Sequence, residues 1–345
     1  MLIEKWNGSI KDKEKIIELF QIVFGDNEFS SKEYFEWIYQ KNPQGDPIIV
    51  LAKEEKTHSV IGVETIIPMN IWINCRRIKS SLSCNSVVHP DYRNQGIFGK
   101  LVDEIQKIAK DEKFECIFGV PNPNSYHVFM NQGFSELGKL KIFGKPFKIS
   151  EYFGNKSVLK PLDLLIKREQ NFTQTESFKE KFDSKYDRFF NEKINQDGIM
   201  TAKNKDFLNW RYKNHPTREY ETYNLIEKNE LLSYIIIRKT MFQNKQVAII
   251  LDFEINPKIN EIKKISDFLI SVFNNYREKN MGMIITCNHK SYEYRILKKL
   301  GFFTIPKIFK PDPFYFIFSV LNSSQKERFE KFENWFVSFG DYDVF

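Results

Sequence analysis

The sequence has no long hydrophobic run. It contains no stretch of about 18 consecutive apolar residues, the length that a transmembrane helix requires. Its opening stretch, MLIEKWNGSIKDKEK, also lacks the apolar segment that follows the basic start of a signal peptide. We therefore expect a cytoplasmic protein that does not span a membrane.

Cysteine is scarce, and the few cysteines are scattered. None stands in a Cys-x-x-Cys pair or beside a histidine cluster, which argues against a zinc site and against a disulfide framework. We expect no metal and four free, buried thiols: Cys75, Cys84, Cys116 and Cys287.

Neither sign of charge dominates the sequence. The formal net charge is +7, and the lysines are spread along the chain without a basic stripe or an aromatic RNA-binding motif. We therefore expect anionic small ligands such as nucleotides and no nucleic acid. The composition, 41% hydrophobic and 28% charged over 345 residues, is that of a soluble globular protein long enough for two domains.

Helical and strand patterns alternate in the first half, which favours an α/β or α+β fold. Apolar residues recur at helical spacing over 16–24, and Ser30 with Glu33 forms a possible capping box for the next helix. A second amphipathic helix is predicted over 97–109 and a short one from about Asn124. Strands are predicted at 47–52, 60–68, 71–73, 78–88, 115–120 and 137–143.

The second half repeats markers of the first half in the same order. The pairs are Trp37 with Trp210, Pro90 with Pro257, Ser125 with Ser291, and Gly133 with Gly301. We therefore predict an N-terminal domain over 1–146, a connector with helical pieces over 147–200, and a degenerate C-terminal copy over 201–345.

The turn after Pro90 carries the chemistry. The strand ending at His89 leads through DYRNQ into a helix near Gly96, and the free N–H groups at such a helix start suit a pyrophosphate. Gly96 lets phosphate oxygens approach the backbone, and Arg93 adds a positive charge. The alternative is an ordinary strand-turn-helix connection in which glycine is present only because the turn requires its φ angle. The second copy has no such turn after Pro257, so we expect one cofactor site.

This segment resembles the signature of the GNAT superfamily of acetyl-CoA-dependent N-acetyltransferases. Arg93-Asn94-Gln95-Gly96-Ile97 is similar to the family's Arg/Gln-x-x-Gly-x-Gly/Ala motif, and Val87-Val88-x-Pro90 to the strand before it. Asn124, Phe129 and Gly133-Phe134 resemble the family's later Asn…aromatic-x-x-x-Gly-Phe segment. The resemblance implies tandem domains, each with a mixed, mostly antiparallel twisted sheet flanked by helices.

The resemblance also implies a set of residues that bind acetyl-CoA, which acts as co-substrate. Backbone groups of Val87 and Val88 would hold the pantetheine arm and the acetyl carbonyl. Asn124 would either contact the ligand or cap the short helix. The pyrophosphate would lie on the turn and the helix start, which consist of Arg93, Asn94, Gln95, Gly96, Ile97, Phe98 and Gly99.

Two positions depart from the family pattern. Phe98 replaces the second small residue, so the helix start is either shaped differently or binds a shifted phosphate. Phe129 stands where many members carry a tyrosine proposed to protonate the leaving thiolate. The tyrosine is then absent, unless Tyr126 supplies its hydroxyl from one helical turn earlier.

The implied reaction is direct attack of an amine on the thioester, with no covalent enzyme intermediate. A general base is a carboxylate, a histidine or an ordered water. Glu64 is a candidate base, with a solvent-facing strand position as the alternative. Asn85 either contacts the acceptor or makes a hydrogen bond on the sheet face. His127 is either a base or an exposed helical residue.

We expect an N-acetyltransferase that modifies a primary amine of a small acceptor. Resemblance to bacterial tandem-GNAT proteins points to an amino sugar or a nucleotide sugar. One alternative is aminoacyl transfer to a peptidoglycan precursor, although the retained Arg93 and Gly96 favour CoA. The other is a non-catalytic module that binds acetyl-CoA, because the leaving-group tyrosine is missing.

Overall fold

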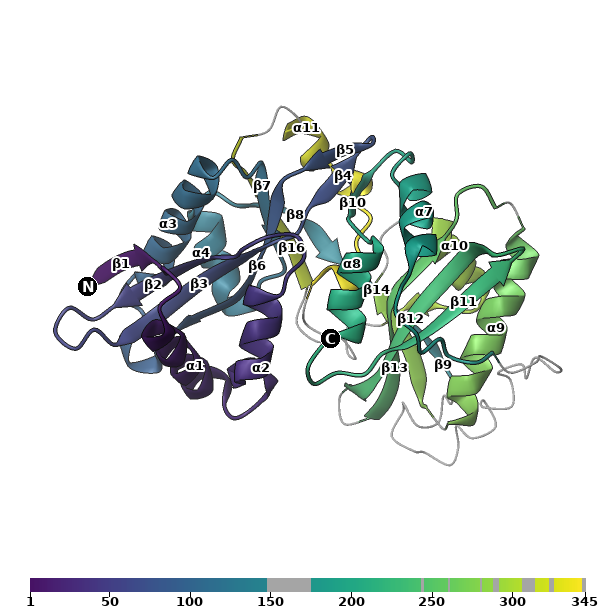
Figure 1. Ribbon diagram of the computed structural model, residues 1–345, viewed down its shortest axis with the longest axis horizontal. Coiled ribbons are helices and arrows are strands. Elements are labelled where there is room, and N and C mark those ends of the chain that lie inside the picture. Colours follow the sequence, from purple (N-terminus) through teal and green to yellow (C-terminus); the bar gives the residue numbers. More distant parts are fainter. Residues whose placement is uncertain are drawn as a thin grey trace. The chain divides into compact units, whose positions relative to one another are not determined.

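The computed structural model forms two compact units, which interleave along the chain (Figure 1). Unit 1 comprises Met1–Lys139, Asp197–Arg218 and Asp312–Trp335, and unit 2 comprises Leu140–Gln196, Glu219–Pro311 and Phe336–Phe345. Much of the predicted connector lies outside the described residues. The structure describes residues 1–147, 175–242, 245–259, 261–279, 281–287, 292–305, 314–322 and 326–342.

Unit 1 is built on a seven-stranded sheet. Strands β6 and β7 run parallel, whereas β1–β2, β2–β3, β3–β6 and β7–β16 are antiparallel pairs. In spatial order the strands are β1 (Leu2–Lys5), β2 (Ile48–Lys53), β3 (Val60–Pro68), β6 (Ser80–Val88), β7 (Cys116–Gly119), β16 (Phe314–Val320) and β8 (Ser135–Leu140).

Helices cover both faces of this sheet (Figure 1). On one face, Leu101, Val102 and Ile105 of α3 (Ile97–Asp111) pack against alternate residues of β2. Beside α3 lies α4 (Pro123–Asn131), and α1 (Ile10–Phe24) covers the opposite face. Because both faces are buried, β2 and β3 are apolar almost throughout.

Shorter elements complete unit 1. A three-stranded sheet contains β10 (Ile199–Thr201), β4 (Ile71–Ile73) and β5 (Arg76–Ile78). Two short helices each continue into a π-helical turn. They are α2 (Lys32–Phe35) with η2 (Glu36–Gln40), and α8 (Lys205–Leu208) with η5 (Asn209–Lys213). The remaining turns and helix are η1 (Glu28–Ser30), η3 (Pro90–Tyr92), α11 (Lys326–Phe329) and η7 (Phe332–Asn334).

Unit 2 has a six-stranded sheet of closely similar topology. Strands β13 and β14 are parallel, and the other pairs with a resolved register are antiparallel. In spatial order the strands are β11 (Glu221–Glu227), β12 (Glu230–Phe242), β13 (Lys245–Ile255), β14 (Met283–Cys287), β9 (Ile142–Pro146) and β15 (Phe303–Thr304). The helices are α7 (Ser184–Lys193), α9 (Ile262–Glu278), α10 (Tyr292–Lys299) and η8 (Phe339–Asp341).

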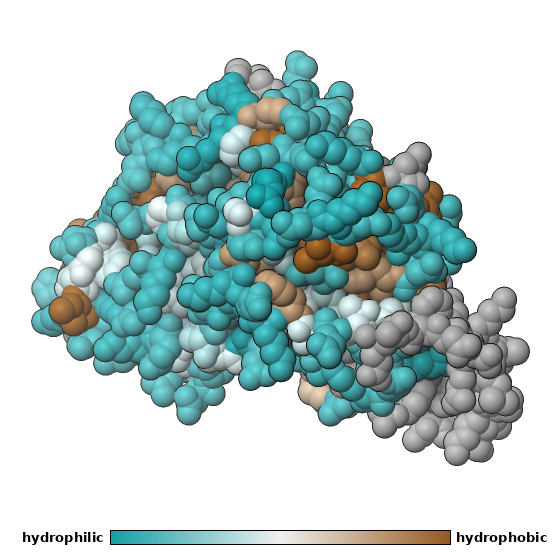
Figure 2. Space-filling view, turned by 45° about the vertical axis from the view of Figure 1, so that its right-hand side comes forward, coloured by the Kyte–Doolittle hydropathy of each residue, from teal (hydrophilic) through white to brown (hydrophobic). Residues whose placement is uncertain are grey.

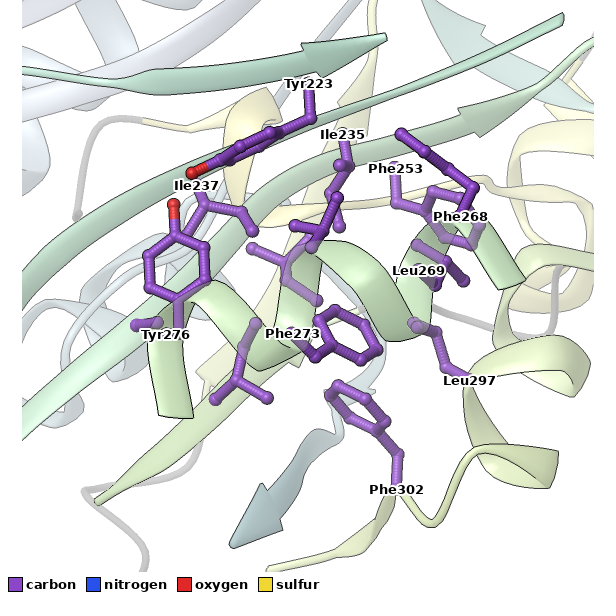
Figure 3. Packing of buried hydrophobic residues seen from close by; sticks show 14 of the residues in the cluster. Tyr223, Ile235, Ile237, Phe253, Phe268, Leu269, Phe273, Tyr276, Leu297 and Phe302 are labelled. Carbon is purple, nitrogen blue, oxygen red and sulfur yellow. The ribbon is translucent and has the colours of Figure 1, made fainter. Parts of the chain in front are cut away.

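The core of unit 2 lies between α9 and the sheet (Figure 3). Phe273 of α9 meets Phe302 with ring centroids 5.6 Å apart, and Leu269 and Leu297 fill the space beside them. Leu269 and Phe273 are one helical turn apart on α9, so the hydrophobic stripe of that helix determines which face packs on the sheet.

Each unit takes one strand from the other half of the sequence. β16 pairs with β7 in unit 1, and β9 pairs with β14 in unit 2 (Figure 1). Both inserted strands occupy the same relative place, between the strand that follows α3 or α9 and the strand that follows α4 or α10. The two sheets therefore match in strand order through an exchange of their last strands.

The structure corrects three details of the sequence interpretation. Ser31, not Ser30, caps α2 by accepting a hydrogen bond from the amide of Tyr34. The predicted strand over 137–143 is two strands, β8 and β9, which belong to different sheets. None of the four cysteines forms a disulfide, but Cys75 is exposed and Cys84 is half-buried, so only Cys116 and Cys287 are buried thiols.

The described surface agrees with the charged composition. The face in Figure 2 is mainly hydrophilic, with hydrophobic side chains in small separate groups. Among the helices of the described ranges, none has both the length and the apolar character needed to cross a membrane. The same ranges hold no group of three or more His, Cys, Asp or Glu side chains arranged for a metal ion.

Candidate active site

The turn before α3 contains two residues in the left-handed region. Asn94 has φ +62° and Gly96 has φ +72°. Asparagine and glycine are the residues that adopt this region at low cost. A Cβ on Gly96 would have no heavy atom within 4 Å, so the space above the turn is open. The backbone angle alone therefore accounts for glycine here, and the open space leaves room for a ligand.

A row of amides at this turn has no protein acceptor. Within the described residues, no backbone N–H from Asn94 to Gly99 donates a hydrogen bond, and the first helical bond runs from Lys100 N to Gly96 O at 3.3 Å. The helix dipole adds partial positive charge at the same place. Arg93 is exposed beside the turn, and its Nε donates to Val88 O at 3.3 Å. These features together favour an anion.

The strand leading into the turn separates from its parallel neighbour. β6 and β7 pair only from Ser80 with Cys116 to Ser83 with Gly119, while β6 continues to Val88. His89 N donates to Ile61 O of β3 at 2.9 Å. Because neighbouring strand amides point to opposite sides, the Val88 amide points into the gap beyond Gly119. Val87 is buried, and Val88 is half-buried.

A β-bulge interrupts β6 within this gap. The register of β3 and β6 shifts between Val63 and Thr65, and Asn85 has φ +53°. Asn85 Nδ2 donates to Tyr39 Oη at 3.0 Å and lies 3.5 Å from Tyr34 Oη. The amide of Asn85 is thus held by two buried tyrosines, neither of which we had assigned from the sequence.

Glu64 of β3 lies buried next to the bulge. Ser83 Oγ donates to Glu64 Oε1 at 2.8 Å, while Oε2 has no hydrogen-bond partner in the described part of the chain. Burial raises the pKa of Glu64 to about 8, although the hydroxyls of Ser86 and Ser83 lower it. The solvent-facing alternative for Glu64 is wrong, since its side chain is fully buried. Ser83 and Ser86 are half-exposed, and they connect this carboxyl to the gap.

The α4 candidates lie at different depths. Asn124 and His127 are exposed, and Asn122 rather than Asn124 caps α4 by accepting from the amides of Asn124 and Ser125. Tyr126 Oη donates to Glu136 at 2.5 Å. This hydrogen bond raises the pKa of Tyr126 to about 12, so its hydroxyl is a neutral donor already engaged.

Phe98 and Gly99 connect α3 to α4. Phe98 packs edge-on against Phe129, with ring centroids 5.3 Å apart. A Cβ on Gly99 would lie 2.5 Å from the side chain of Gln132, so glycine permits close approach of the two helices. The large residue at position 98 therefore faces the helix pair and leaves the amides of Ile97 and Gly99 free.

The corresponding place in unit 2 is filled by its own side chains. Asn256 N donates to Leu232 O at 2.9 Å, so the Ile255 amide, like that of Val88, points to the side of β14. There it donates to Glu293 Oε1 at 3.3 Å. Lys193 Nζ lies 2.7 Å from the same oxygen.

A buried lysine also pairs with a second carboxylate at this place in unit 2. Lys193 Nζ also lies 2.9 Å from Glu254 Oε2. Burial lowers the pKa of Lys193, but the carboxylates of Glu254 and Glu293 outweigh this effect and raise that pKa above its usual value. The side chains of Lys193, Glu254 and Glu293 form what we call the ion triad, and it satisfies an amide that is free in unit 1.

Comparison with known proteins agrees with the geometry of unit 1. The family model for the acetyltransferase (GNAT) domain matches residues 7–136, which contain the turn, α3 and the gap beside β6. The N-terminal part of the chain is a GNAT domain. The predicted family is confirmed for residues 7–136. No curated protein matches the sequence.

Solved structures share the fold at low sequence identity. A GCN5-related N-acetyltransferase from Anabaena variabilis is 12% identical, with a TM-score of 0.67 over 93% of this chain and 73% of that one. A probable N-acyltransferase from Enterococcus faecalis is 10% identical, with a TM-score of 0.61 over 95% and 75%. The N-myristoyltransferase of Saccharomyces cerevisiae, solved with myristoyl-CoA, is 11% identical, with a TM-score of 0.58 over 93% and 83%.

These similarities confirm the predicted fold class. Both units have mixed, mostly antiparallel sheets flanked by helices, and the neighbours cover nearly the whole chain. The GNAT domain has residues that fit an acyl-CoA thioester, namely the free amides from Asn94 to Gly99 and the Val88 amide. The sequence interpretation did not identify Tyr34, Tyr39 or the ion triad. Two tyrosines five residues apart do not face the same way in an α-helix, and nothing in the sequence signals the π-helical turn that carries Tyr39.

Proposed function

We propose that the chain transfers an acetyl group from acetyl-CoA to a primary amine of a small acceptor. The observation that carries this proposal is the row of free amides from Asn94 to Gly99 beside the free Val88 amide. The amides from Asn94 to Gly99 suit a pyrophosphate, and the Val88 amide suits a thioester carbonyl. Arg93, Asn94, Gln95 and Gly96 form the phosphate turn, with Ile97, Phe98 and Gly99 as the first helical residues. Val87 and Val88 line the pantetheine arm.

The polar surroundings of the bulge favour a short acyl group. Ser83, Asn85 and Ser86 line this part of β6, and the carboxyl of Glu64 is buried behind them. A long alkyl chain next to a buried carboxyl would leave polar groups without water or partners, which is unfavourable. Acetyl-CoA is therefore the proposed donor, and a myristoyl-type donor is disfavoured.

Glu64 is the proposed general base, acting through Ser83. The amine must lose a proton when its nitrogen bonds to the carbonyl carbon, and a base of pKa near neutrality is effective at physiological pH. Glu64 has that pKa, and the hydroxyl of Ser83 connects it to the gap. His127, exposed on α4, is a second candidate base for an acceptor that approaches from that side.

The leaving thiolate needs no tyrosine of its own in this proposal. A thiol has a pKa of roughly 8.5, so a thiolate leaves at neutral pH and takes its proton from solvent. This is consistent with Phe129 at the family's tyrosine position. Tyr126 then keeps its hydrogen bond to Glu136. Asn124, exposed at the start of α4, is a proposed ligand contact.

We further propose that acetyl-CoA binds only in unit 1. In unit 2 the ion triad occupies the corresponding amide, and KINEIKKISD follows Pro257 in place of the phosphate turn. In sequence, the two copies of the fold would span 1–146 and 201–345, and 147–200 would connect them. The last strand of each copy would be exchanged.

An amino sugar or a nucleotide sugar is the acceptor class that we propose, for a cytoplasmic enzyme. The test is release of free CoA thiol from acetyl-CoA over a panel of amines that includes amino sugars, nucleotide amino sugars and polyamines. Turnover with a sugar amine supports the proposal. Turnover only with another amine class would overturn the acceptor, and absence of acetyl-CoA binding would overturn the donor.

A second candidate is a module that binds acetyl-CoA without turnover. The engaged hydroxyl of Tyr126 and the phenylalanine at position 129 favour it, because neither offers a free acid at the sulfur. Calorimetry with acetyl-CoA together with the thiol assay separates the two. Binding without turnover across the panel would favour the module.

A further inference from the structure

A buried polar network lies beneath the β6 bulge. Tyr39 Oη is 3.3 Å from Thr65 Oγ1, and Thr65 Oγ1 donates to Cys84 O. Asn85, the next residue, donates its side-chain amide to Tyr39 Oη at 3.0 Å. One tyrosine hydroxyl therefore contacts β3 and the bulged part of β6 together.

Tyr39 does not face the gap where the thioester would bind. Its side chain is 1% exposed, and Tyr34 and Thr65 are fully buried. Burial raises the pKa of Tyr39 well above its usual value, so the hydroxyl stays protonated. This buried, neutral hydroxyl is hydrogen-bonded to Asn85 and can therefore stabilise the bulge.

The helix that carries Tyr39 is itself fixed by a reciprocal tryptophan pair. Trp37 Nε1 donates to Trp210 O and Trp210 Nε1 donates to Trp37 O, both at 2.8 Å. The two rings stack with centroids 5.0 Å apart and an interplanar angle of 17°. Both tryptophans lie in π-helical turns, η2 and η5, of unit 1. Such turns are uncommon and frequently occur at functional sites.

The bulge needs this support because its geometry is unusual. Asn85 has φ +53°, a conformation that most side chains avoid, and it stands three residues before Val88. A bulge redirects the backbone groups that follow it. Any relaxation at Asn85 would therefore rotate the Val88 amide away from the gap.

We propose that Tyr39, acting through Asn85, is a positioning residue that aligns the Val88 amide with the thioester carbonyl. The inference rests on the proposed function, because it assigns the network a task in acyl transfer. The role differs from substrate binding, since Tyr39 is buried and its hydroxyl contacts Thr65 and Asn85.

The test compares Tyr39→Phe with Tyr34→Phe. Both changes remove one hydroxyl from the same helix, but Tyr34 Oη lies 3.5 Å from Asn85 Nδ2 and is the weaker partner. Misplacement of a reacting group by about 1 Å costs roughly 100-fold in rate. We expect kcat of Tyr39→Phe to fall by about 10- to 100-fold, KM for acetyl-CoA to change less than about twofold, and Tyr34→Phe to lose less.

Asn85→Gly provides a second, independent variant. Glycine keeps the left-handed backbone and removes the amide that Tyr39 holds. If the two residues act as one unit, Asn85→Gly should resemble Tyr39→Phe, and the double variant should be no worse than either single variant. Additive losses in the double variant would contradict the proposed coupling.

A spectroscopic measurement separates this inference from the proposed function. The 13C shift of acetyl-CoA labelled at the thioester carbonyl reports hydrogen bonding to that oxygen without turnover. A changed shift in Tyr39→Phe, with unchanged affinity for 3′,5′-ADP, supports positioning even if no amine is acetylated. An unchanged shift and kcat would overturn the inference while leaving the proposed function intact. Failure of the wild-type protein to bind acetyl-CoA would overturn both.

Discussion

Glu64 is the residue whose environment differs most from the interpretation of its sequence position. Its place in the apolar strand over 60–68 allowed either a candidate base or a solvent-facing residue, and the fully buried side chain excludes the second. Period-two patterning cannot distinguish these cases when helices cover both faces of a sheet. The neighbouring Ser83 and the bulge give the carboxyl its partner, and both depend on strand pairing.

Stability should therefore depend on pH through Glu64. Its pKa is about 8 in the folded protein against an ordinary 4.5, so between about pH 5 and 8 the folded state holds a proton that the unfolded state has lost. The free energy of unfolding should fall as pH rises through this window. Denaturant unfolding at several pH values checks this, and Glu64→Gln should reduce the slope. An equal slope in the variant would contradict the assigned pKa.

Activity should show the opposite trend if Glu64 is the base. The ionised form accepts the proton, so kcat/KM should rise with pH and level off above about 8. Glu64→Gln should lower the rate at pH 8 by about 100-fold and remove this rise. The acceptor amine also titrates, so a second acceptor of different amine pKa serves as control. If the pH at which kcat/KM rises changes with the acceptor, and the rise persists in Glu64→Gln, the rise reports the amine of the substrate and not Glu64.

At the scale of elements, the strand–turn–helix segment was predicted closely and the last strands were not. The helix predicted over 97–109 is observed over Ile97–Asp111, because its apolar stripe and the preceding turn are both local signals. The strand predicted over 137–143 divides at Lys141, since β8 and β9 pair with strands far away in the sequence. Local periodicity carries no information on which sheet a strand joins.

Close packing of α3 on β3 gives an element-scale prediction. A Cβ on Gly62 would lie 3.0 Å from Leu101 and 3.2 Å from Ile97, at the start of α3. Gly62→Val should overpack this contact and lower the free energy of unfolding by about 1–3 kcal/mol. Because the helix start would move, affinity for 3′,5′-ADP should also fall. Denaturant unfolding and calorimetry check both, and an unchanged affinity would show that α3 tolerates displacement.

At the scale of the whole molecule, the repeated markers predicted two similar sheets, whereas the exchange of strands needed the structure. The repeat is visible because Trp37 and Trp210, or Pro90 and Pro257, keep their order. The exchange is not visible because β9 and β16 follow their own halves in sequence. Markers in a fixed order are thus visible in the sequence, and strand pairing across the chain is not.

The exchange predicts that residues 1–147 alone do not fold as unit 1. The fragment would lack β16, which lies between β7 and β8, so β8 would have no neighbour and β7 would have an open edge. We expect no cooperative unfolding transition and a tendency to aggregate, measured by calorimetry and light scattering. A fragment that unfolds cooperatively at the temperature of the full chain would contradict this account.

The ion triad predicts a large effect of one buried lysine. Lys193→Met removes the buried cation that lies 2.9 Å and 2.7 Å from two carboxylates and should lower the free energy of unfolding by about 3–5 kcal/mol. Lys264→Met, which removes an exposed partner of Glu227, is the control and should cost less than about 1 kcal/mol. Equal losses from the two changes would show that the triad is not a strongly coupled buried group.

The most direct test of the central claim measures CoA binding at the turn before α3. Gly96→Asn keeps a residue that tolerates the left-handed angle, as Asn94 does, but places a side chain over the free amides. Gly301→Asn in unit 2 is the matched control, since Gly301 has φ +91° and equally open space.

By titration calorimetry, the wild-type protein and Gly301→Asn should each bind one CoA per chain with equal affinity. Gly96→Asn should bind CoA and 3′,5′-ADP at least about tenfold more weakly, a loss of about 1.4 kcal/mol, while unfolding at nearly the same temperature. Unchanged affinity in Gly96→Asn, or a second equivalent of CoA in any of the three proteins, would contradict a single acyl-CoA site at this turn.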